Sequence, residues 1–359
     1  MFAHPSFPGQ KTAFVLFPVS PKAGFLVNCI ATGAYYKVND AKTKIQKAES
    51  PQESSHDCMS VSTNLMGMMI NKPNSSGYLK FPKRVNLTLK TRLQDIQLNQ
   101  VRLIPQGIGY RCELVYTKEI QPQHPLDHTR VASIDLGVRN LVTLVTNIGT
   151  HPIVVKGGVV KSINQYYNKR RATYQRIYRK KKVTHTSKRL WRLSIRRNRK
   201  LADYFHKLSH KVVTWCITQN IGTLVIGYNE NWKQQVHLGT RTNQTFVNIP
   251  FYWFLYQLCY KAEEQGLRVI KQEESYTSKC SFLDQEALHH HSKYQGRRIS
   301  RGLFRARDGT LINADMNAAY NILSKAVPNA FADGIEGVGL HPKRVTLEED
   351  WLSISNETI

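Results

Sequence analysis

The sequence predicts a mixed α/β domain of about 200 residues, preceded by a smaller β-rich domain. Three observations lead to this prediction. Short apolar runs alternate with helical patterns after residue 131, an order typical of α/β folds. Residues 78–122 alternate between apolar and polar side chains, as strands do. Long basic segments lack acidic residues, which indicates a surface for a polyanion.

Length and composition limit the class of protein. A chain of 359 residues suggests two or three domains and is long enough to bury a core. Hydrophobic residues make up 41% and charged residues 21%, which argues against wholesale disorder. The chain has 51 Lys and Arg against 25 Asp and Glu, a net charge of +26. Nucleic acid is the expected partner, and an acidic membrane surface is the rival.

Targeting signals and cysteine pairs are not expected. No apolar run is long enough to cross a bilayer, and prolines interrupt the apolar start of the chain, which argues against a signal peptide. No two of the six cysteines lie within four residues of each other. This spacing excludes a CxxC zinc knuckle and disfavours a disulfide framework. We therefore expect a reducing, cytoplasmic setting.

The N-terminal third divides into two segments. Residues 1–75 are weakly patterned and include a polar, linker-like stretch at 42–57, so no fold is assigned to them. Residues 76–127 contain the alternating segment and are predicted to form a small β-barrel or sheet. The larger domain is expected over residues 128–328, and residues 329–359 are interpreted as a C-terminal tail.

The larger domain begins with three strand-like runs. They are VASIDLG (131–137), NLVTLVTN (140–147) and HPIVVKG (151–157), and the first has an acidic residue at its end. Turn-forming residues lie between them, at 137–140 and 147–150. The spacing predicts an antiparallel meander.

Two long basic helices are predicted next, at about 162–182 and 188–218, joined by a polar turn near Thr184–Ser187. No acidic residue lies between Asp135 and Asp203, and this stretch holds 18 Lys and Arg. A helix that is merely exposed usually mixes the two signs, so the pattern favours phosphate binding. The candidate nucleic-acid contacts, including four from a later basic segment, are Lys169, Arg170, Arg171, Arg176, Arg179, Lys180, Lys181, Lys182, Lys188, Arg189, Arg192, Arg196, Arg197, Arg199, Lys200, Arg297, Arg298, Arg301 and Arg305.

The remaining elements alternate between strands and helices. In order, we expect a strand at 223–228, a long polar loop at 233–250, a helix at 250–265, a strand at 267–275, an irregular basic insertion at 281–310 and a helix at 314–326. The resulting order, β-β-β-α-β-α-β-(insertion)-α, is that of an RNase H-like domain, although other α/β folds share much of it.

Two acidic residues in this basic region are candidates for catalysis. Asp135 ends an apolar strand, and Asp315 begins a helix. Nucleases of this fold class use carboxylates from several chain segments to hold Mg²⁺. Each residue also has a structural interpretation, since Asp135 suits a turn and Asp315 suits a helix N-cap. Their occurrence at opposite ends of one α/β region favours the catalytic interpretation.

Four segments resemble the transposon-encoded RNA-guided nuclease family known as TnpB or OrfB, which is related to Fanzor proteins and type V CRISPR effectors. They are SIDLGVRNLVTLV (133–145), LVIGYNENWKQ (224–234), YTSKCS (276–281) and GTLINADMNAAYNIL (309–323). The resemblance covers about 195 residues in the right order. It implies a RuvC-type site of Asp, Glu and Asp, in which Asp135 matches the first acid and Asp315 the third.

The second acid departs from the usual family pattern. Gly227 stands where the family normally has Glu, whereas one branch carries this acid just before the YTSK motif. Glu273 and Glu274 occupy that place here, and only one is expected to serve because successive strand residues face opposite sides. We favour Glu274, then Glu273, then Glu230. The alternative is that the site has lost its glutamate and does not cut.

A zinc site is not expected, although most of the family has a four-cysteine ribbon before the last Asp. Only Cys280 remains in that region, followed by His289, His290 and His291, which suit a tetrahedral site poorly. The basic segment at 296–307 is expected to contact nucleic acid instead. His206 and His210, spaced i,i+4 after Asp203, are also assigned to a nucleic-acid-binding face rather than to a metal.

The resemblance implies an RNA-guided DNA endonuclease encoded by a transposon. Mg²⁺, for which Mn²⁺ substitutes, would be held by Asp135, Glu274 and Asp315. The partners would be a guide RNA from the transposon end and double-stranded target DNA, with no membrane, in the cytoplasm and nucleoid of a prokaryotic host. Two alternatives remain: an RNA-guided DNA-binding protein without cleavage, and a general basic nucleic-acid-binding protein. Residues 1–75 look too short for complete recognition helices, so a truncated recognition region is also considered.

Overall fold

The computed structural model describes strand segments between residues 10 and 117, and then residues 125–182, 187–229, 249–332, 334–335, 338–351 and 353. The chain divides into two compact units. One comprises Met1–Glu119 with His185–Arg192, and the other comprises Ile120–Thr184 with Leu193–Ile359. Each unit is described by itself.

The first unit is built from antiparallel strands. Its described strands are β1 (Gln10–Pro18), β2 (Phe25–Cys29), β3 (Ala34–Val38), β4 (Tyr78–Lys80), β5 (Thr88–Lys90), β6 (Gln97–Gln106) and β7 (Gly109–Thr117). A sheet in the order β1-β7-β6 is accompanied by the pairs β2-β3 and β4-β5. Leu114 and Tyr116, two residues apart on β7, are both buried, as one face of a half-buried strand requires. Strands β1 to β3 lie in the segment to which the sequence pattern assigned no fold.

The second unit contains a six-stranded mixed sheet within the described residues, in the order β12-β11-β8-β9-β10-β16. The strands are β8 (Asp127–Asp135), β9 (Asn140–Thr146), β10 (Ile153–Lys156), β11 (Ile221–Gly227), β12 (Arg268–Gln272) and β16 (Lys343–Val345). Strands β8, β9 and β10 form the predicted antiparallel meander. Strands β11 and β12 extend the sheet beyond β8, with β11 parallel to both neighbours. The prediction of a mixed α/β fold is thus confirmed.

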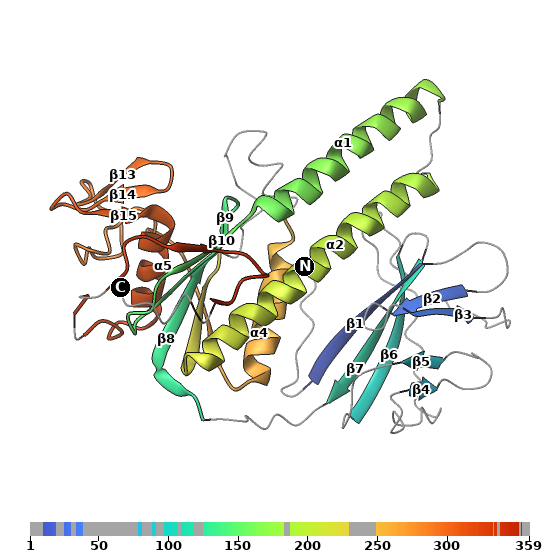
Figure 1. The fold of residues 1–359 in the computed structure, drawn as a ribbon, viewed down its shortest axis with the longest axis horizontal. Coiled ribbons are helices and arrows are strands. Elements are labelled where there is room, and N and C mark those ends of the chain that lie inside the picture. Colours follow the sequence, from blue (N-terminus) through green and yellow to red (C-terminus); the bar gives the residue numbers. More distant parts are fainter. Residues whose placement is uncertain are drawn as a thin grey trace, which may run out of the picture. The chain divides into compact units, whose positions relative to one another are not determined.

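The two faces of this sheet form separate hydrophobic cores (Figure 1). Ala132 and Ile134 of β8 pack in one core with α2 (Lys188–Thr218) and α4 (Phe251–Glu264). Val131 of β8 packs in the other core, whose largest contribution comes from α5 (Ala314–Ala326). Alternation along β8 therefore assigns Asp135, which is in phase with Val131, to the face covered by α5.

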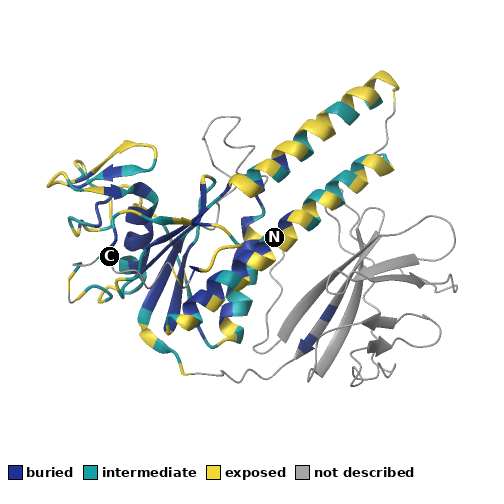
Figure 2. Ribbon diagram, in the orientation of Figure 1, coloured by how far each residue is buried: buried dark blue, intermediate teal, exposed yellow. Residues whose placement is uncertain are grey.

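Helices α1 (Gly158–Lys180) and α2 differ in burial (Figure 2). Only Val160 and Asn164 of α1 are buried, whereas the buried residues of α2 begin at Leu201. Near the base of α1, Arg197 Nε donates a hydrogen bond to Asn164 Oδ1 at 2.8 Å. The C-terminal half of α2 is thus a core element, and the more basic segments before it are largely exposed. No helix in the part of the chain that the structure describes combines the length and apolar character needed to cross a membrane.

Two segments contain structure that the sequence pattern did not indicate. The insertion at 281–310, expected to be irregular, contributes to a small antiparallel sheet of β13 (Arg297–Ser300), β14 (Leu303–Arg305) and β15 (Leu311–Asn313). The segment interpreted as a tail supplies β16, which pairs in parallel with β10. It also supplies Trp351, whose side chain is buried in the larger core. These two segments lack apolar periodicity because each segment contributes only a few side chains to the core.

Candidate active site

Asp135 is the last residue of β8 and is partly buried. Ser133, two residues earlier on the same face, donates a hydrogen bond through its hydroxyl to the carbonyl oxygen of Ala319 in α5. Thr143 of β9 pairs directly with Asp135 across the sheet. Its hydroxyl oxygen is buried without a hydrogen-bond partner among the described residues. The Asp135 carboxylate therefore emerges at a polar edge between the sheet and α5.

Asp315 lies in the first turn of α5 but does not cap the helix. Asn313 takes that role, because its side-chain oxygen accepts hydrogen bonds from the backbone N–H groups of Asp315 and Met316. The Asp315 carboxylate instead accepts a 2.6 Å hydrogen bond from Asn140 Nδ2 and a 3.3 Å contact from the Arg298 guanidinium. The structure thus removes the simple N-cap interpretation of Asp315.

Glu274 follows β12 and turns towards β11. Its Oε2 accepts a 3.0 Å hydrogen bond from Asn229 Nδ2, and its backbone N–H donates to Asn229 Oδ1 at 3.3 Å. Its other oxygen, Oε1, is buried and has no hydrogen-bond partner among the described residues. Gly227 lies beneath this carboxyl group: a Cβ atom there would overlap Glu274 Oε1 and lie 2.8 Å from Ile322 Cδ1. The absence of a side chain at residue 227 makes room for Glu274.

Glu273, the next candidate for the second acid, is engaged elsewhere. Glu273 is exposed, and its carboxylate pairs with Lys325 at 2.8 Å and accepts a hydrogen bond from the Ser275 backbone. Glu230 lies outside the described residues. Of the adjacent pair, Glu274 is the one whose charge raises the pKa of Asp135.

The three acids are electrostatically coupled. Burial, and then the carboxylates of Glu274 and Asp315, raise the pKa of Asp135 well above its ordinary value, while Arg298 opposes this effect. Burial, followed by the charge of Glu273, raises the pKa of Glu274 to about 7. For Asp135 and Glu274, burial near other carboxylates favours the protonated form, and a bound cation would oppose this effect. This arrangement is typical of functional sites.

The chemistry of the donors fits a divalent cation. Carboxylate oxygens are the ligands that Mg²⁺ prefers, and the buried, unpartnered Oε1 of Glu274 is an unused donor of this kind. However, no three His, Cys, Asp or Glu side chains among the described residues are already grouped as a metal-binding set. Hydrogen bonds from Asn140, Arg298 and Asn229 currently engage the acids. An ion would be held by Asp135, Glu274 and Asp315 after local rearrangement of these contacts.

A chain of hydrogen bonds behind Asp315 was not foreseen from the sequence. Lys156 Nζ on β10 donates to Asn140 Oδ1 at 2.6 Å, and Asn140 Nδ2 donates in turn to Asp315. Asn140 is a buried polar residue at the start of β9. Since its oxygen is held by Lys156, its nitrogen is directed at the carboxylate. The only signal in the sequence for this role was the position of Asn140 within the segment 133–145, which resembles the nuclease family.

The predicted nucleic-acid contacts fall into two groups. Those on the helices are mostly exposed: Lys169, Arg170, Arg171, Arg176, Arg179, Lys180, Lys181, Lys182, Lys188, Arg189, Arg192, Arg196 and Lys200. Arg197 and Arg199 are partly buried, and Arg197 bonds to Asn164 and lies 5.3 Å from the centre of the Tyr167 ring. On the small sheet, Arg297, Arg298 and Arg301 are exposed and Arg305 is partly buried. Arg197 thus contributes to the packing of α1 against α2.

Asp203, His206 and His210, which the sequence analysis assigned to a nucleic-acid-binding face rather than to a metal, all lie on α2. Asp203 forms an exposed ion pair with Lys207 at 2.8 Å. His206 and His210 line a pocket of about 320 Å³ between α2 and α4. Burial, then Lys261 and His210, lower the pKa of His206. The charge of Asp203 opposes this lowering of the His206 pKa.

Comparisons with known proteins find similar sequences. A family model described as OrfB_IS605, probable transposase, matches residues 113–233, and one described as Cas12f1-like, TNB domain, matches residues 251–322. The CRISPR-associated endodeoxyribonuclease Cas12f1 of Sulfoacidibacillus thermotolerans is 28% identical over 252 residues, covering 66% of this chain and 54% of that protein. The TnpB-like protein ORF457 of Acidianus two-tailed virus is 25% identical over 221 residues, covering 58% and 44%.

A solved structure also resembles the chain. A cryo-EM structure of a Cas12f1-sgRNA-target DNA complex superposes with a TM-score of 0.48 at 18% identity, covering 64% of this chain and 46% of that one. The chain spans about half the length of the curated relatives that it matches. The two family models match successive parts of the chain, in the order in which the candidate acids occur. The sequence similarity of the chain is therefore to TnpB-like proteins and type V CRISPR effectors.

Proposed function

We propose that this chain is a transposon-encoded, RNA-guided DNA endonuclease that hydrolyses phosphodiester bonds at a RuvC-type site. The observation that carries the proposal is the coupling of Asp135, Glu274 and Asp315, which come from β8, the end of β12 and α5. The strand order and directions of the mixed sheet, a meander followed by two strands parallel to β8, are those of RNase H-like nucleases. The similarity to TnpB-like proteins and Cas12f1 supports the same activity.

Each acid has a proposed role. Asp135 and Asp315 bind Mg²⁺, or Mn²⁺ in its place, and Glu274 completes one site through its free Oε1. When bound, the divalent ion supplies Lewis-acid stabilisation of charge on the phosphate oxygens. Asn229 orients Glu274, and Asn140 orients Asp315. The partly buried setting limits competition from water and strengthens these interactions.

The proposed partners are a guide RNA from the transposon end and double-stranded target DNA. The similar Cas12f1 complex contains a single guide RNA and target DNA. The exposed Lys and Arg of α1 and α2 are suited to hold an RNA–DNA duplex by its phosphates, since such contacts position a duplex without reading its sequence. We further propose that residues 76–127 form a wedge-like β domain, and that the protein acts in the cytoplasm and nucleoid of a prokaryote.

One observation favours a second candidate, an RNA-guided DNA-binding protein without cleavage. Arg298 contacts Asp315 at 3.3 Å, in the place where the proposed cation would bind. This candidate predicts target binding with no product under any Mg²⁺ or Mn²⁺ condition. A general nucleic-acid-binding protein remains the third reading, and it predicts no discrete copurifying RNA.

The test is cleavage by protein coexpressed with its native flanking DNA, so that a guide RNA is captured. The purified complex is incubated with a plasmid library in which the guide-matching sequence lies beside randomised bases, with Mg²⁺ and with EDTA. The variants are Asp135→Ala, Asp315→Ala and Glu274→Ala. Glu273→Ala is the matched control, because Glu273 is adjacent to Glu274 but pairs with Lys325.

The outcomes separate the three candidates. Mg²⁺-dependent cutting that is lost in the three site variants and kept in Glu273→Ala supports the proposed nuclease and its relocated glutamate. Cutting that survives Glu274→Ala but not Asp135→Ala moves the second acid elsewhere, Glu230 included. A discrete bound RNA with target retention and no product supports the binding-only protein. Absence of a discrete RNA leaves the general nucleic-acid-binding protein.

A further inference from the structure

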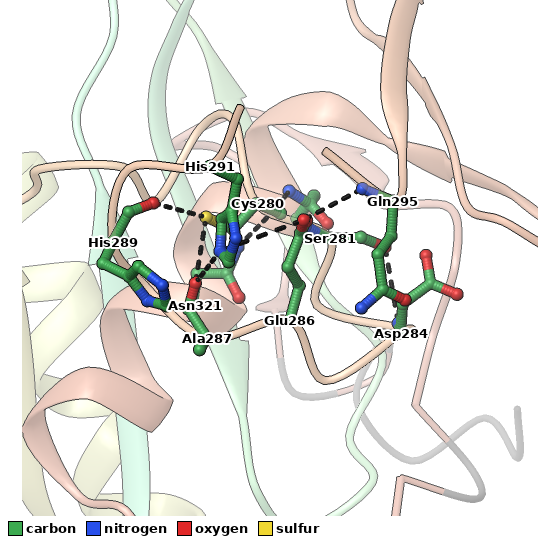
Figure 3. A network of polar contacts seen from close by, with 10 residues as sticks. Cys280, Ser281, Asp284, Glu286, Ala287, His289, His291, Gln295 and Asn321 are labelled. Atoms are coloured by element: carbon green, nitrogen blue, oxygen red, sulfur yellow. Dashed lines mark hydrogen bonds and ion pairs between the residues drawn. The ribbon is translucent and has the colours of Figure 1, made fainter. Parts of the chain in front are cut away.

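The segment from Cys280 to Gln295 lies where most of the family has a zinc ribbon, and its side chains form the network of polar contacts shown in Figure 3. The Cys280 thiol is buried and donates to the carbonyl oxygens of Ala287 and His289, at 3.4 and 3.7 Å. His291 Nε2 also lies 2.7 Å from the Ala287 oxygen. These potential ligands are directed at backbone carbonyls, and no metal-binding group exists among the described residues.

A buried carboxylate takes the central place in this segment. The side chain of Glu286 is only 1% exposed. Its Oε2 accepts a 2.8 Å hydrogen bond from the backbone N–H of Ser281, and its Oε1 accepts a 2.9 Å bond from that of Gln295. One side chain thereby joins two backbone positions 14 residues apart, as a ribbon metal joins two loops. Charge-assisted bonds of this kind are stronger than neutral ones.

Both ends of this bridge are tied to the candidate active site. At the first end, the amides of Asn317 and Asn321 on α5 donate to the Cys280 carbonyl at 2.8 Å, and Asn317 Oδ1 accepts from the Phe282 N–H. At the other end, Gln295 directly precedes Gly296 and β13. A Cβ atom at Gly296 would overlap the Phe304 ring of β14, so this entry into the small sheet is tightly packed. β13 carries Arg298, which contacts Asp315 on α5.

We propose that this module takes no structural metal and that Glu286 acts in its place, as the positioning residue that closes the loop and sets β13 so that Arg298 faces Asp315. The path runs from α5 through Ser281, Glu286 and Gln295 to Arg298 and returns to α5 at Asp315. This inference concerns how the module is held and does not require that the chain cuts DNA, so it is tested separately from the proposed function.

Metal content is the first measurement. The untagged full chain, purified without chelators, is analysed for zinc by mass spectrometry and melted with and without 1,10-phenanthroline. We expect no stoichiometric zinc and an unchanged melting temperature. Stoichiometric zinc that disappears in Cys280→Ser or His291→Ala would overturn the inference.

The role of Glu286 is tested by limited trypsin digestion of Glu286→Gln. The glutamine side chain keeps the shape of the glutamate but offers only one acceptor oxygen to the N–H groups of Ser281 and Gln295. One of the two hydrogen bonds is therefore lost, and the bridge between these two backbone positions opens. We expect cleavage after Lys293, Arg297 and Arg298 to become roughly tenfold faster, the change that corresponds to about 1.4 kcal/mol of local opening. Asp308→Asn is the matched control, because Asp308 bonds only to Thr310 within its own exposed turn. Equal cleavage rates in Glu286→Gln and in the unsubstituted chain would refute the positioning role.

A measurement on the unsubstituted protein tests the bridge even when Glu286→Gln does not fold. Hydrogen exchange of the unsubstituted protein is expected to show slow exchange of the Ser281 and Gln295 amides. Exchange as fast as that of an exposed loop amide such as Lys293 would contradict the bridge.

Discussion

The carboxyl group of Glu274 occupies the space that a side chain at residue 227 would need. A Cβ atom built on Gly227 would lie 3.0 Å from Glu274 Cδ and closer still to Oε1. The family normally places the second acid on this strand, whereas Glu274, the acid proposed for that role here, comes from the end of β12. A side chain at residue 227 and the observed position of the Glu274 carboxyl group exclude each other sterically, so the proposed relocation of the acid requires the glycine.

Gly227→Ala is therefore expected to displace Glu274. The added methyl group would destabilise the fold by about 1–3 kcal/mol, as overpacking typically does, and would reduce cleavage. Gly158→Ala is the control, because no atom lies within 4 Å of its Cβ position. Thermal melting and the cleavage assay would check both effects, and equal behaviour of the two variants would contradict the steric relationship.

Moving the acid back should rescue the site. We expect Gly227→Glu combined with Glu274→Ala to cut faster than Glu274→Ala alone, since the vacated space can hold the carboxyl group from β11. Rates from single-turnover cleavage would check this. A double variant no more active than Glu274→Ala would show that the two positions are not equivalent.

The hydrogen bonds from Lys156 to Asn140 and from Asn140 to Asp315 are expected to determine how much Mg²⁺ cleavage requires. Asn140→Ala should raise the Mg²⁺ concentration for half-maximal cleavage by about 10–100-fold, the range typical of partners that orient metal ligands. Lys156→Met should act in the same direction with a smaller effect. Asn147→Ala is the control, because Asn147 bonds to the backbone of β8 at Thr129 and Val131. A loss of melting temperature in all three variants with unchanged Mg²⁺ dependence would indicate a structural role only.

The raised pKa of Glu274 predicts how stability depends on pH. Because the folded-state pKa, about 7, lies above the ordinary value of 4.5, the folded protein binds the proton more tightly than the unfolded chain. Without divalent ions, stability from this group is therefore fully present below about pH 4 and declines as pH rises through 7, by at most roughly 3 kcal/mol. Melting in EDTA from pH 5 to 8 should show a steeper decline for the unsubstituted protein than for Glu274→Gln. Parallel curves would contradict the shift.

Two adjacent arginines on α2 should behave differently. Arg196 is exposed, so Arg196→Ala should weaken RNA binding and lower the slope of log affinity against log salt by about 0.7–0.9 for each lost phosphate contact. Arg197 bonds to Asn164 within the protein, so Arg197→Ala should lower the melting temperature. Filter binding across a salt series and thermal melting would separate the two roles. An unchanged salt slope in Arg196→Ala would argue against phosphate contact there.

The sequence predicted the larger domain better than the details of its site. Asp135 and Asp315 were found because each ends or begins an element with clear periodicity. The choice between Glu273 and Glu274 depends on which side chain turns inwards after β12, and spacing alone could only favour one. Asn140 and Lys156 carry no periodic signal, because their role depends on a hydrogen bond between strands and α5.

Short strands with few buried side chains were not predicted from the sequence. Strands β13 to β15 are three or four residues long, and β13 is exposed throughout, so no alternation marks it. Strand β16 is recognisable only from its pairing with β10, which lies far away in the chain. Pairing with strands that are distant in the sequence, rather than local propensity, determines the secondary structure of such segments.

The pairing of β16 with β10 has a consequence for synthesis. Ile153 and Lys343 are 190 residues apart in the sequence yet adjacent in the sheet. While the ribosome is still adding the intervening residues, the nascent chain exposes the β10 edge, a template for wrong pairing. Loop closure over this span is also slow. Early termination before residue 343 should therefore favour aggregation, and chaperone binding to the unfinished chain would protect it.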